Sequence, residues 1–453
     1  MKRKLLVLLA LGLVMAFSSS VFAADVKFSG SFYVVGLYQD KTDLMNVADS
    51  TWEHNNSTAF YYQRLRVLAE VVVSPGLSLI TRFDAMEREW GAPRASATGF
   101  SSLIGDFDTV ASRAENENIA FDWAYIRYAS PIGVFTVGYQ DDLVWGTKFA
   151  DYSRPAGKIA WAYTFGDVTL MADVAKILEL SKTAKLSSSP WSASTDNDVD
   201  KYSVAAKYAW KGGEAGMKVF YLRNAATRAI DDFKSEIYGV IPYAIAKFGP
   251  VTVEAEVDYY WGKLAHGDTT GYKLKMDSLG IYIDALADLG MFYAGGTFAY
   301  LSGEKNLIDD INNGGTVTMM AGGKDWMPCL IMFNFDRTYW AGILPGDAWA
   351  DFGVMTNAWF YQVRGGVRPM PALTLGASLA YARADKKQNL MAINAGKDYG
   401  IELDVTATYA ITNNLSYMLG VGYLWTGDYY KDANDPRKLQ DNYLVINKLT
   451  LTF

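Results

Sequence analysis

The chain has 453 residues, with 42 Lys and Arg against 49 Asp and Glu, so its formal net charge is −7. This acidic balance argues against a nucleic-acid-binding protein, which would carry a basic surface. The single cysteine, Cys329, excludes an intrachain disulfide framework and a metal site built from several cysteines. Because there are only two histidines besides, the sequence also argues against haem and transition-metal cofactors, and we expect none.

The first 23 residues have the pattern of a secretory signal peptide. Lys2, Arg3 and Lys4 supply its positive charge, a short apolar run spans 5–17, and Ala23 ends a cleavage site of small and apolar residues. The apolar run is shorter than the roughly 20 residues that a membrane-spanning helix needs. We therefore predict cleavage after Ala23 and one domain over 24–453. Loss of the three basic residues leaves 39 against 49 acidic ones, a net charge of −10.

The composition after the signal is unusual for a soluble protein. Aromatic residues make up 14% of the chain and there are 40 glycines, yet the mean hydropathy is only +0.01. No run of 18 apolar residues follows the signal, which excludes membrane-spanning helices. A β-barrel whose strands alternate between lipid and water would have this composition. A large periplasmic β-sandwich would have much the same, so the pattern along the chain must distinguish them.

Three segments alternate between apolar and polar residues for about ten positions, at 251–261, 359–368 and 401–409. In the first of these, Val257, Tyr259 and Trp261 share one face, and carboxylates occupy the other. Alternation of this length, with aromatic residues at the ends, is typical of membrane strands.

The connections between strands differ in length in a regular way. Tight turns are expected at Ser74-Pro75-Gly76, Pro131-Ile132-Gly133, Phe165-Gly166-Asp167, Gly212-Gly213, Gly249-Pro250, Asp288-Leu289-Gly290, Met370-Pro371 and Thr412-Asn413-Asn414. Longer, mostly polar stretches lie between them, at 39–56, 90–116, 181–199, 305–355 and 432–441. Short periplasmic turns and long extracellular loops are the outer-membrane arrangement. A soluble sandwich has no reason to sort its connections in this way.

Eight short turns join sixteen strands, and the first and last strands add two more. We therefore predict an all-β fold, a transmembrane antiparallel up-and-down β-barrel of about 18 strands. Weak signals around 200–212 and 271–287 would reduce the number to 16. The barrel must close, because an open edge in lipid would leave backbone amides unpaired.

The last strand brings Leu449, Leu451 and Phe453 onto one face. A terminal Phe after alternating apolar residues resembles the signal that the outer-membrane assembly machinery reads. In a closed barrel this strand must pair with residues 26–38. Phe453 is therefore predicted to be an assembly signal.

Several motifs in the C-terminal third resemble those of a known group of proteins. They are Gly400-Ile401-Glu402-Leu403-Asp404 with Thr406, the turn at Asn413-Asn414, and the segment Gly420-Val421-Gly422-Tyr423-Leu424-Trp425-Thr426-Gly427-Asp428-Tyr429. They resemble the closing strands of alginate-export-like and related proteobacterial porins. Tyr62-Gln63-Arg64-Leu65-Arg66 is similar to the arginine-bearing second strand of that group. The resemblance covers about a third of the chain and implies a pore-forming barrel of about 18 strands. It does not imply alginate, since the readable luminal face is mixed in charge.

Luminal side chains set the selectivity of a barrel, because the membrane constrains the outward ones. Alternation predicts charged pore-lining residues at Arg64, Arg66, Glu70, Arg82, Asp84, Arg88, Glu254, Glu256, Asp258, Arg364, Arg368, Glu402 and Asp404. In an 18-strand barrel the second and eleventh strands lie across the lumen, so the first arginines would face the carboxylates of 251–261. Two interpretations remain open. Either a transverse field orients dipolar solutes, or the charges pair with luminal neighbours and keep the interior wet.

The stretch 305–355 is unusually apolar for a loop that faces water. It contains Met319, Met320, Trp326, Met327, Cys329, Ile331, Phe333, Phe335, Trp340 and Trp349. We expect it either to fold inward and narrow the pore, or to pack against a partner or the lipid rim. Partial alternation over 329–335 also allows an extra hairpin. The segment 143–157, with Trp145, Lys148, Asp151 and Arg154, is a second candidate for an in-folded loop.

His54 and His266 lie near acidic residues in long loops, but no nucleophile motif accompanies them, so we predict a protein that is not an enzyme. The sequence favours a porin in the outer membrane of a Gram-negative bacterium, with a water-filled channel for passive diffusion of small hydrophilic solutes or ions. The alternatives are a surface binding or structural barrel whose loops engage an extracellular partner or polysaccharide, and a polymer-export pore. Expected partners are membrane lipid, lipopolysaccharide and the outer-membrane assembly machinery, in a monomer or a homotrimer.

Overall fold

The computed structural model describes residues 25–42, 44, 57–91, 119–180, 196–226, 228, 233–344, 353–387, 396–431 and 438–453. The predicted signal peptide over 1–23 and His54 lie outside these residues, so both expectations stay predictions. In the described part of the chain, no helix has the length and apolarity needed to cross a membrane.

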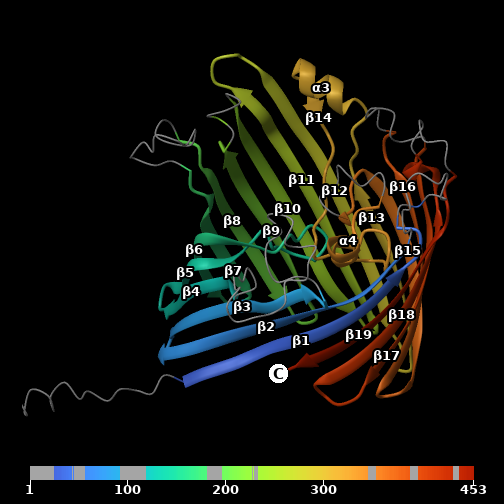
Figure 1. Ribbon diagram of the computed structural model, residues 1–453. Coiled ribbons are helices and arrows are strands. Elements are labelled where there is room, and N and C mark those ends of the chain that lie inside the picture. The colour runs from blue at the N-terminus through green and yellow to red at the C-terminus, as the bar shows by residue number, and fades with distance from the viewer. Residues whose placement is uncertain are drawn as a thin grey trace, which may run out of the picture.

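Eighteen strands form the wall of the molecule (Figure 1). They are β1 Asp25–Gln39, β2 Thr58–Ser74, β3 Leu77–Glu89, β4 Ala120–Ser130, β5 Gly133–Asp142, β6 Arg154–Phe165, β7 Val168–Leu178, β8 Val199–Trp210, β9 Gly213–Asn224, β10 Phe233–Phe248, β11 Val251–Gly267, β12 Lys273–Asp288, β13 Phe292–Leu301, β15 Ala358–Met370, β16 Leu373–Ala384, β17 Asp398–Ala410, β18 Leu415–Thr426 and β19 Asn442–Thr452. Each pairs antiparallel with its neighbours in chain order, and β13 pairs directly with β15. The two-residue strand β14 Thr316–Val317 pairs in parallel with β12 and is not one of the eighteen wall strands.

The wall closes between the first and last strands. The β1–β19 register runs from Ser31 opposite Thr452 to Gln39 opposite Leu444. Beyond it, Gly30 and Phe453 exchange two backbone hydrogen bonds of 2.8 and 3.1 Å. The predicted closed barrel of 18 strands is therefore confirmed, including the pairing of the last strand with the first. The 16-strand alternative is wrong, because the segments with weak signals form β8 and β12.

All eight predicted tight turns join consecutive strands at one end of the barrel, which we call the short-turn end. Between β2 and β3, Gly76 has φ +80, a conformation that glycine adopts without strain. Pro75 before it fixes φ near −65°, so the pair suits the centre of a type II turn. The short helix α3 Leu307–Asn313 lies at the opposite end of the barrel (Figure 1).

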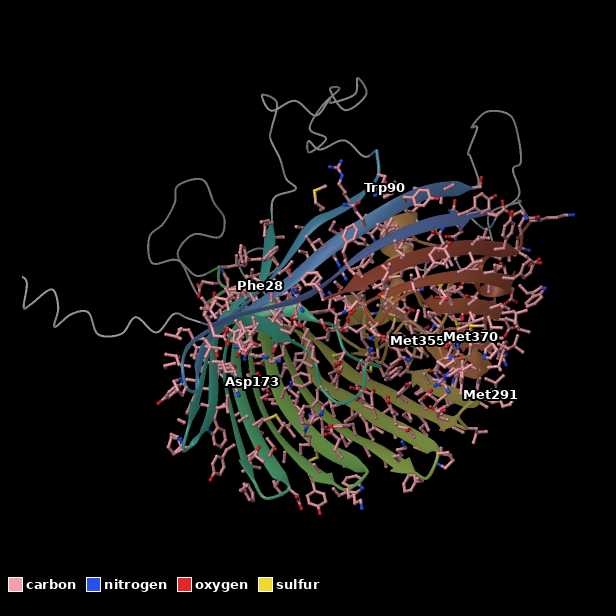
Figure 2. The ribbon with its side chains drawn as sticks, turned by 90° about the horizontal axis from the view of Figure 1, so that it is seen from below. Phe28, Trp90, Asp173, Met291, Met355 and Met370 are labelled. Atoms are coloured by element: carbon pink, nitrogen blue, oxygen red, sulfur yellow. The ribbon has the colours of Figure 1, made fainter. Side chains whose placement is uncertain are left out.

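Side chains project from both faces of the strands (Figure 2), and the outward face is apolar and aromatic. Tyr202, Tyr221, Tyr238 and Trp261 stand opposite one another in turn on β8 to β11, with ring centroids 6.4, 5.0 and 5.9 Å apart. A ring pair nearer the short-turn end joins Tyr208 to Trp210 on β8. Aromatic rows at two heights are the girdles that border the lipid-facing band of a membrane barrel.

The main cluster of buried apolar side chains lies inside the wall. Inward residues of β1, β2, β12, β15 and β17 contribute to it, together with the connection between β13 and β15. Figure 1 shows the helix α4 Phe335–Ala341 within the outline of the barrel. The extra hairpin that partial alternation allowed over 329–335 does not form: these residues are an irregular segment that leads into α4.

Candidate site in the barrel lumen

Two of the long connections enter the lumen and bind each other there. One is residues 143–153 between β5 and β6. The other, residues 318–341, we call the plug segment. The N–H of Asp325 donates to the carbonyl of Asp151 at 3.1 Å. The Asp325 carboxylate in turn accepts from the backbone N–H and the hydroxyl of Ser153, at 2.9 and 2.6 Å. The two connections therefore form one unit inside the barrel.

Aromatic packing attaches this unit to the wall. Phe149 stacks on Tyr282 of β12 with ring centroids 5.0 Å apart. Trp326 of the plug segment meets Phe149 and Phe360 of β15 edge to face, each at 5.3 Å. Edge-to-face and stacked pairs of this kind add about 0.5–1.5 kcal/mol each beyond the area they bury. The described apolar residues of this unusually apolar loop thus belong to the buried core inside the lumen.

Wall carboxylates bind the backbone of both connections. On β17, the two oxygens of Glu402 accept the N–H groups of Ile331 and Met332, both at 2.7 Å. On β11, Glu256 accepts the N–H of Thr147 at 2.6 Å. Leaving a buried N–H group of this kind without a partner costs about 1–3 kcal/mol. Glu402 and Glu256, predicted to line the pore, therefore act here as anchors of the in-folded segments.

The helix α4 carries the plug segment from β17 to the wall of β1 and β2. Asn334 caps the helix by accepting the N–H of Arg337 at 2.9 Å. The buried Arg337 guanidinium donates to Gln39 of β1 at 3.4 Å and to the carbonyl of Gly342 at 3.2 Å. Trp340 stacks on Tyr62 of β2 with centroids 4.5 Å apart. The plug segment thus contacts the wall at β17 and, beyond β18 and β19, at β1 and β2.

A cavity of about 420 Å³ remains between α4 and the wall of β2 to β4. Arg64, Arg66 and Arg82 line it, as predicted from alternation, and so does Asp84. Lys324, Asp325, Met327, Phe335, Asp336, Tyr339 and Trp340 face them from the plug segment. The cavity is therefore lined by charge of both signs and by aromatic rings.

The arginines of this cavity are paired with carboxylates on the same wall. Arg66 forms a bidentate pair with Asp84 at 2.7 and 2.6 Å. Arg82 donates to Asp122 at 3.1 Å and lies 3.7 Å above the ring of Trp123. Arg64 lies 3.4 Å from Glu87. The wall of β2 to β4 is thus a network of alternating charge and not a free row of cations.

The alternation of inward and outward residues did not predict Glu87 and Asp122 in the lumen, because both lie at β-bulges. At Met86, which has φ +54, the β2–β3 register shifts between residues 85 and 88. Glu87 then lines the cavity, while Arg88 stands opposite Gln63, on the face away from the buried Tyr62. A bulge places two residues of one strand against one of its neighbour. The prediction that Arg88 points inward therefore fails for a local reason.

The same disturbance occurs on β4. The β3–β4 register shifts between Arg82 and Phe83, opposite residues 121–123. Asp122 hydrogen-bonds Arg66 and Arg82, while Arg82 also lies over the ring of its neighbour Trp123. Asp122 and Trp123, which are successive in the sequence, therefore lie on the same face of the strand, and strict alternation does not predict this.

The other predicted residues lie apart from this cavity. Glu256 and Asp258 are almost fully buried on β11, and residues 143–153 contact Glu256, so these carboxylates do not face the arginines across open space. Arg364 binds Asp284 in a bidentate pair, with both distances 2.7 Å. Glu254 lies two residues before Glu256 on the same face of β11.

Three further predicted residues lie elsewhere on the wall. Arg368 pairs with Asp288 at 2.9 Å in the exposed short-turn end. Glu70 accepts from Ser78 at 3.0 Å, near the same end. Asp404 lies beside Glu402 and accepts the N–H of Leu330 at 3.3 Å. Their roles in selectivity stay predictions.

One titratable group lies at the junction of the two in-folded connections. Burial raises the pKa of Asp151 to about 7, and the nearby charge of Asp325 adds to the rise, while the N–H of Trp145 opposes it. The Trp145 N–H donates to the Asp151 carboxylate at 2.6 Å. Asp151 therefore changes its charge near neutral pH.

Comparison with known proteins finds likeness in structure but not in sequence. No protein-family model matches the chain, and no curated protein does so. The outer membrane protein OpdK from Pseudomonas aeruginosa aligns with a TM-score of 0.50 and 11% identity over 95% of this chain and 99% of its own. OpdQ from the same bacterium aligns with a TM-score of 0.49 and 11% identity over 96% and 99%, and the outer membrane channel DcaP of Acinetobacter baumannii with 0.43 and 11% over 95% and 98%. The likeness to OpdK confirms the predicted porin-type barrel at the level of the fold.

Proposed function

We propose that this protein is a porin of the Gram-negative outer membrane that lets small hydrophilic solutes diffuse passively through a narrowed lumen. The observation that carries the proposal is the charged cavity of about 420 Å³ between Arg66 and the plug segment, inside a closed 18-strand barrel. A cavity of this size holds one small molecule. The short-turn end would face the periplasm, as in other barrels of this kind.

The lining of the cavity supports passage of polar solutes. Paired charges such as Arg66 and Asp84 keep an interior wet and exclude apolar compounds. The same pairing lowers the net charge of the wall, so we expect weak ion selectivity and a preference for neutral or zwitterionic solutes. A lumen crossed by the plug segment also leaves little width for a polymer, which favours small solutes over polymer export.

The proposal includes the membrane partners and the absence of catalysis. The outward aromatic girdles suit contact with membrane lipid and lipopolysaccharide, and Phe453 suits recognition by the assembly machinery. His266 lies 3.7 Å from Glu236, whose carboxylate is already paired with Lys263 at 3.0 Å. Neither a monomer nor a homotrimer is favoured by these observations.

Planar-bilayer recording of the purified full-length protein tests the proposal. We expect discrete single-channel steps in KCl, together with liposome swelling by amino acids and monosaccharides but not by oligosaccharides. A barrel that inserts and gives neither current nor swelling would overturn the proposal in favour of a surface binding or structural barrel. Swelling by long polysaccharides would favour polymer export instead.

A further inference from the structure

The only cysteine of the chain lies against the two β17 carboxylates that hold the plug segment. The thiol of Cys329 and one oxygen each of Glu402 and Asp404 lie within 4.8 Å of one another. These residues are 3%, 0% and 5% exposed. Thiolate and carboxylate groups converging in a buried place are a ligand set for a metal ion of borderline softness.

The charge of the two carboxylates is poorly balanced by the protein. In the described part of the chain, no Lys, Arg or His forms an ion pair with Glu402 or Asp404. Backbone N–H groups of the plug segment are their main partners. One oxygen of Asp404, Oδ1, has no hydrogen-bond partner although it is buried. Buried carboxylates without a counter-charge are costly, so such a pair takes up either a proton or a cation.

The unpartnered oxygen lies where the wall and the plug segment pack closely together. Gly422 of β18 stands opposite Asp404. An atom at the position of a Gly422 Cβ would lie 2.9 Å from Asp404 Oδ1, 3.2 Å from Leu330 Cβ and 3.4 Å from Ile331 Cδ1. A side chain at position 422 would be too close to this oxygen, so glycine there lets the plug segment pack against the wall beside Asp404 Oδ1.

We propose that Cys329, Glu402 and Asp404 bind one divalent cation of the zinc class, with water as a fourth ligand. The Zn–S distance of about 2.3 Å and Zn–O distances of about 2.0–2.2 Å put tetrahedral ligands roughly 3.5 Å apart. Ligand atoms now within 4.8 Å need to close by about 1 Å. The ion would join the plug segment to the wall, because Cys329 belongs to one and both carboxylates to the other.

Metal binding at this site would release a proton. An ordinary thiol has a pKa of about 8.5 and carries its proton at neutral pH, whereas the thiolate is the form that binds metal. Coordination forms the metal–sulfur bond and transfers that proton to water, so affinity rises with pH.

Another group of acids provides the control. Asp196, Asp198 and Asp200 also converge, but Lys176 binds Asp198 and Asp200, both at 2.8 Å, and Arg223 binds Asp196 at 2.7 Å. Their charge is already balanced, which makes them a poor cation site. Asp198→Asn is thus a matched variant for adventitious binding.

The test uses untagged full-length barrel in detergent, stripped with a chelator and titrated with Zn²⁺ against a chromophoric competitor. We expect one ion per chain, and an affinity lowered roughly tenfold or more by Cys329→Ser and by Asp404→Asn, since even outer-shell partners of a metal are worth about 10–100-fold. Asp198→Asn should bind as the parent does. Co²⁺ should give a thiolate charge-transfer band that Cys329→Ser removes.

Three results would overturn the inference, and none depends on channel activity. They are absence of stoichiometric binding, binding that Cys329→Ser leaves unchanged, and binding that Asp198→Asn abolishes. Circular dichroism of each variant verifies that the barrel is folded before titration. A variant that fails this check is replaced by Cys329→Ala, which removes the ligand with little change in volume.

Discussion

Replacing Glu402 is expected to loosen the plug segment and raise the conductance of the pore. Its carboxylate is fully buried and accepts two backbone N–H groups, from Ile331 and Met332, both at 2.7 Å. Glu402→Ala leaves both N–H groups buried without a partner. Glu402→Gln keeps one carbonyl acceptor and turns the other position into a donor, so it should lose one of the two bonds.

The size of the effect follows from these two bonds. At about 1–3 kcal/mol for each buried N–H group left without a partner, the Ala variant loses roughly 2–6 kcal/mol and the Gln variant about half of that. A tenfold change in an equilibrium corresponds to about 1.4 kcal/mol. The equilibrium between a bound and a released plug segment should therefore shift by roughly 30- to 10⁴-fold in Glu402→Ala, and by roughly 5- to 10²-fold in Glu402→Gln.

Single-channel recording with a chelator present measures this shift without any metal contribution. We expect brief large-conductance openings, rare in the parent, more frequent in Glu402→Gln and most frequent in Glu402→Ala. Thr408→Ala is the control, since Thr408 shares the luminal face of β17 but lies nearer the short-turn end. Equal opening frequencies in Glu402→Ala and the parent would refute the view that this carboxylate anchors the plug segment.

Three further predictions concern selectivity, pH and assembly. Arg64→Glu with Arg66→Glu should shift the reversal potential in a KCl gradient toward cation selectivity, and an unchanged potential would remove both residues from the constriction. Because burial raises the pKa of Asp151 to about 7, cation selectivity should fall as pH drops through about 7, and Asp151→Asn should abolish this dependence. Deleting Phe453 should reduce the folded, membrane-inserted fraction without changing the selectivity of the channels that do form.

The raised pKa of Asp151 also makes the free energy of unfolding depend on pH. Its ordinary value is 3.8, so between about pH 4 and 7 the folded chain holds a proton that the unfolded chain has lost. The free energy of unfolding should therefore decrease as pH rises through this window and level off above it. Urea unfolding at several pH values, compared with Asp151→Asn, measures this; a parallel pH dependence of the two would contradict it.

The barrel was predictable because its physical constraints act on the whole sequence. Lipid on one side and water on the other impose a period of two on every strand, and closure imposes an even number. The turns were equally predictable from the sequence, since Pro75 with Gly76 or Asn413 with Asn414 specify tight connections. These rules need no knowledge of contacts distant in the chain.

The site was predictable only where alternation holds. Arg64, Arg66 and Arg82 follow it, but the bulge at Met86 reverses the phase and hides Glu87. The role of Glu402 as an anchor depends on backbone groups some 70 residues away in the chain, at 331 and 332. No local pattern encodes such a partner, since the plug segment has no period of its own.

The connection between β13 and β15, which contains the plug segment, starts and ends at one place in the wall. Leu301 and Ala358 stand opposite each other in the β13–β15 register, and Asn357 next to them holds both the N–H and the carbonyl of Lys386. Residues 302–357 are therefore an insertion between two paired strands, and the pairing of β13 with β15 does not depend on what the insertion contains. Evolution can lengthen, replace or delete such an insertion while the barrel persists. The sequences of the wall and of the plug segment can therefore diverge at separate rates. A short hairpin joining Leu301 to Ala358 would give an engineer the same barrel with a wide bore.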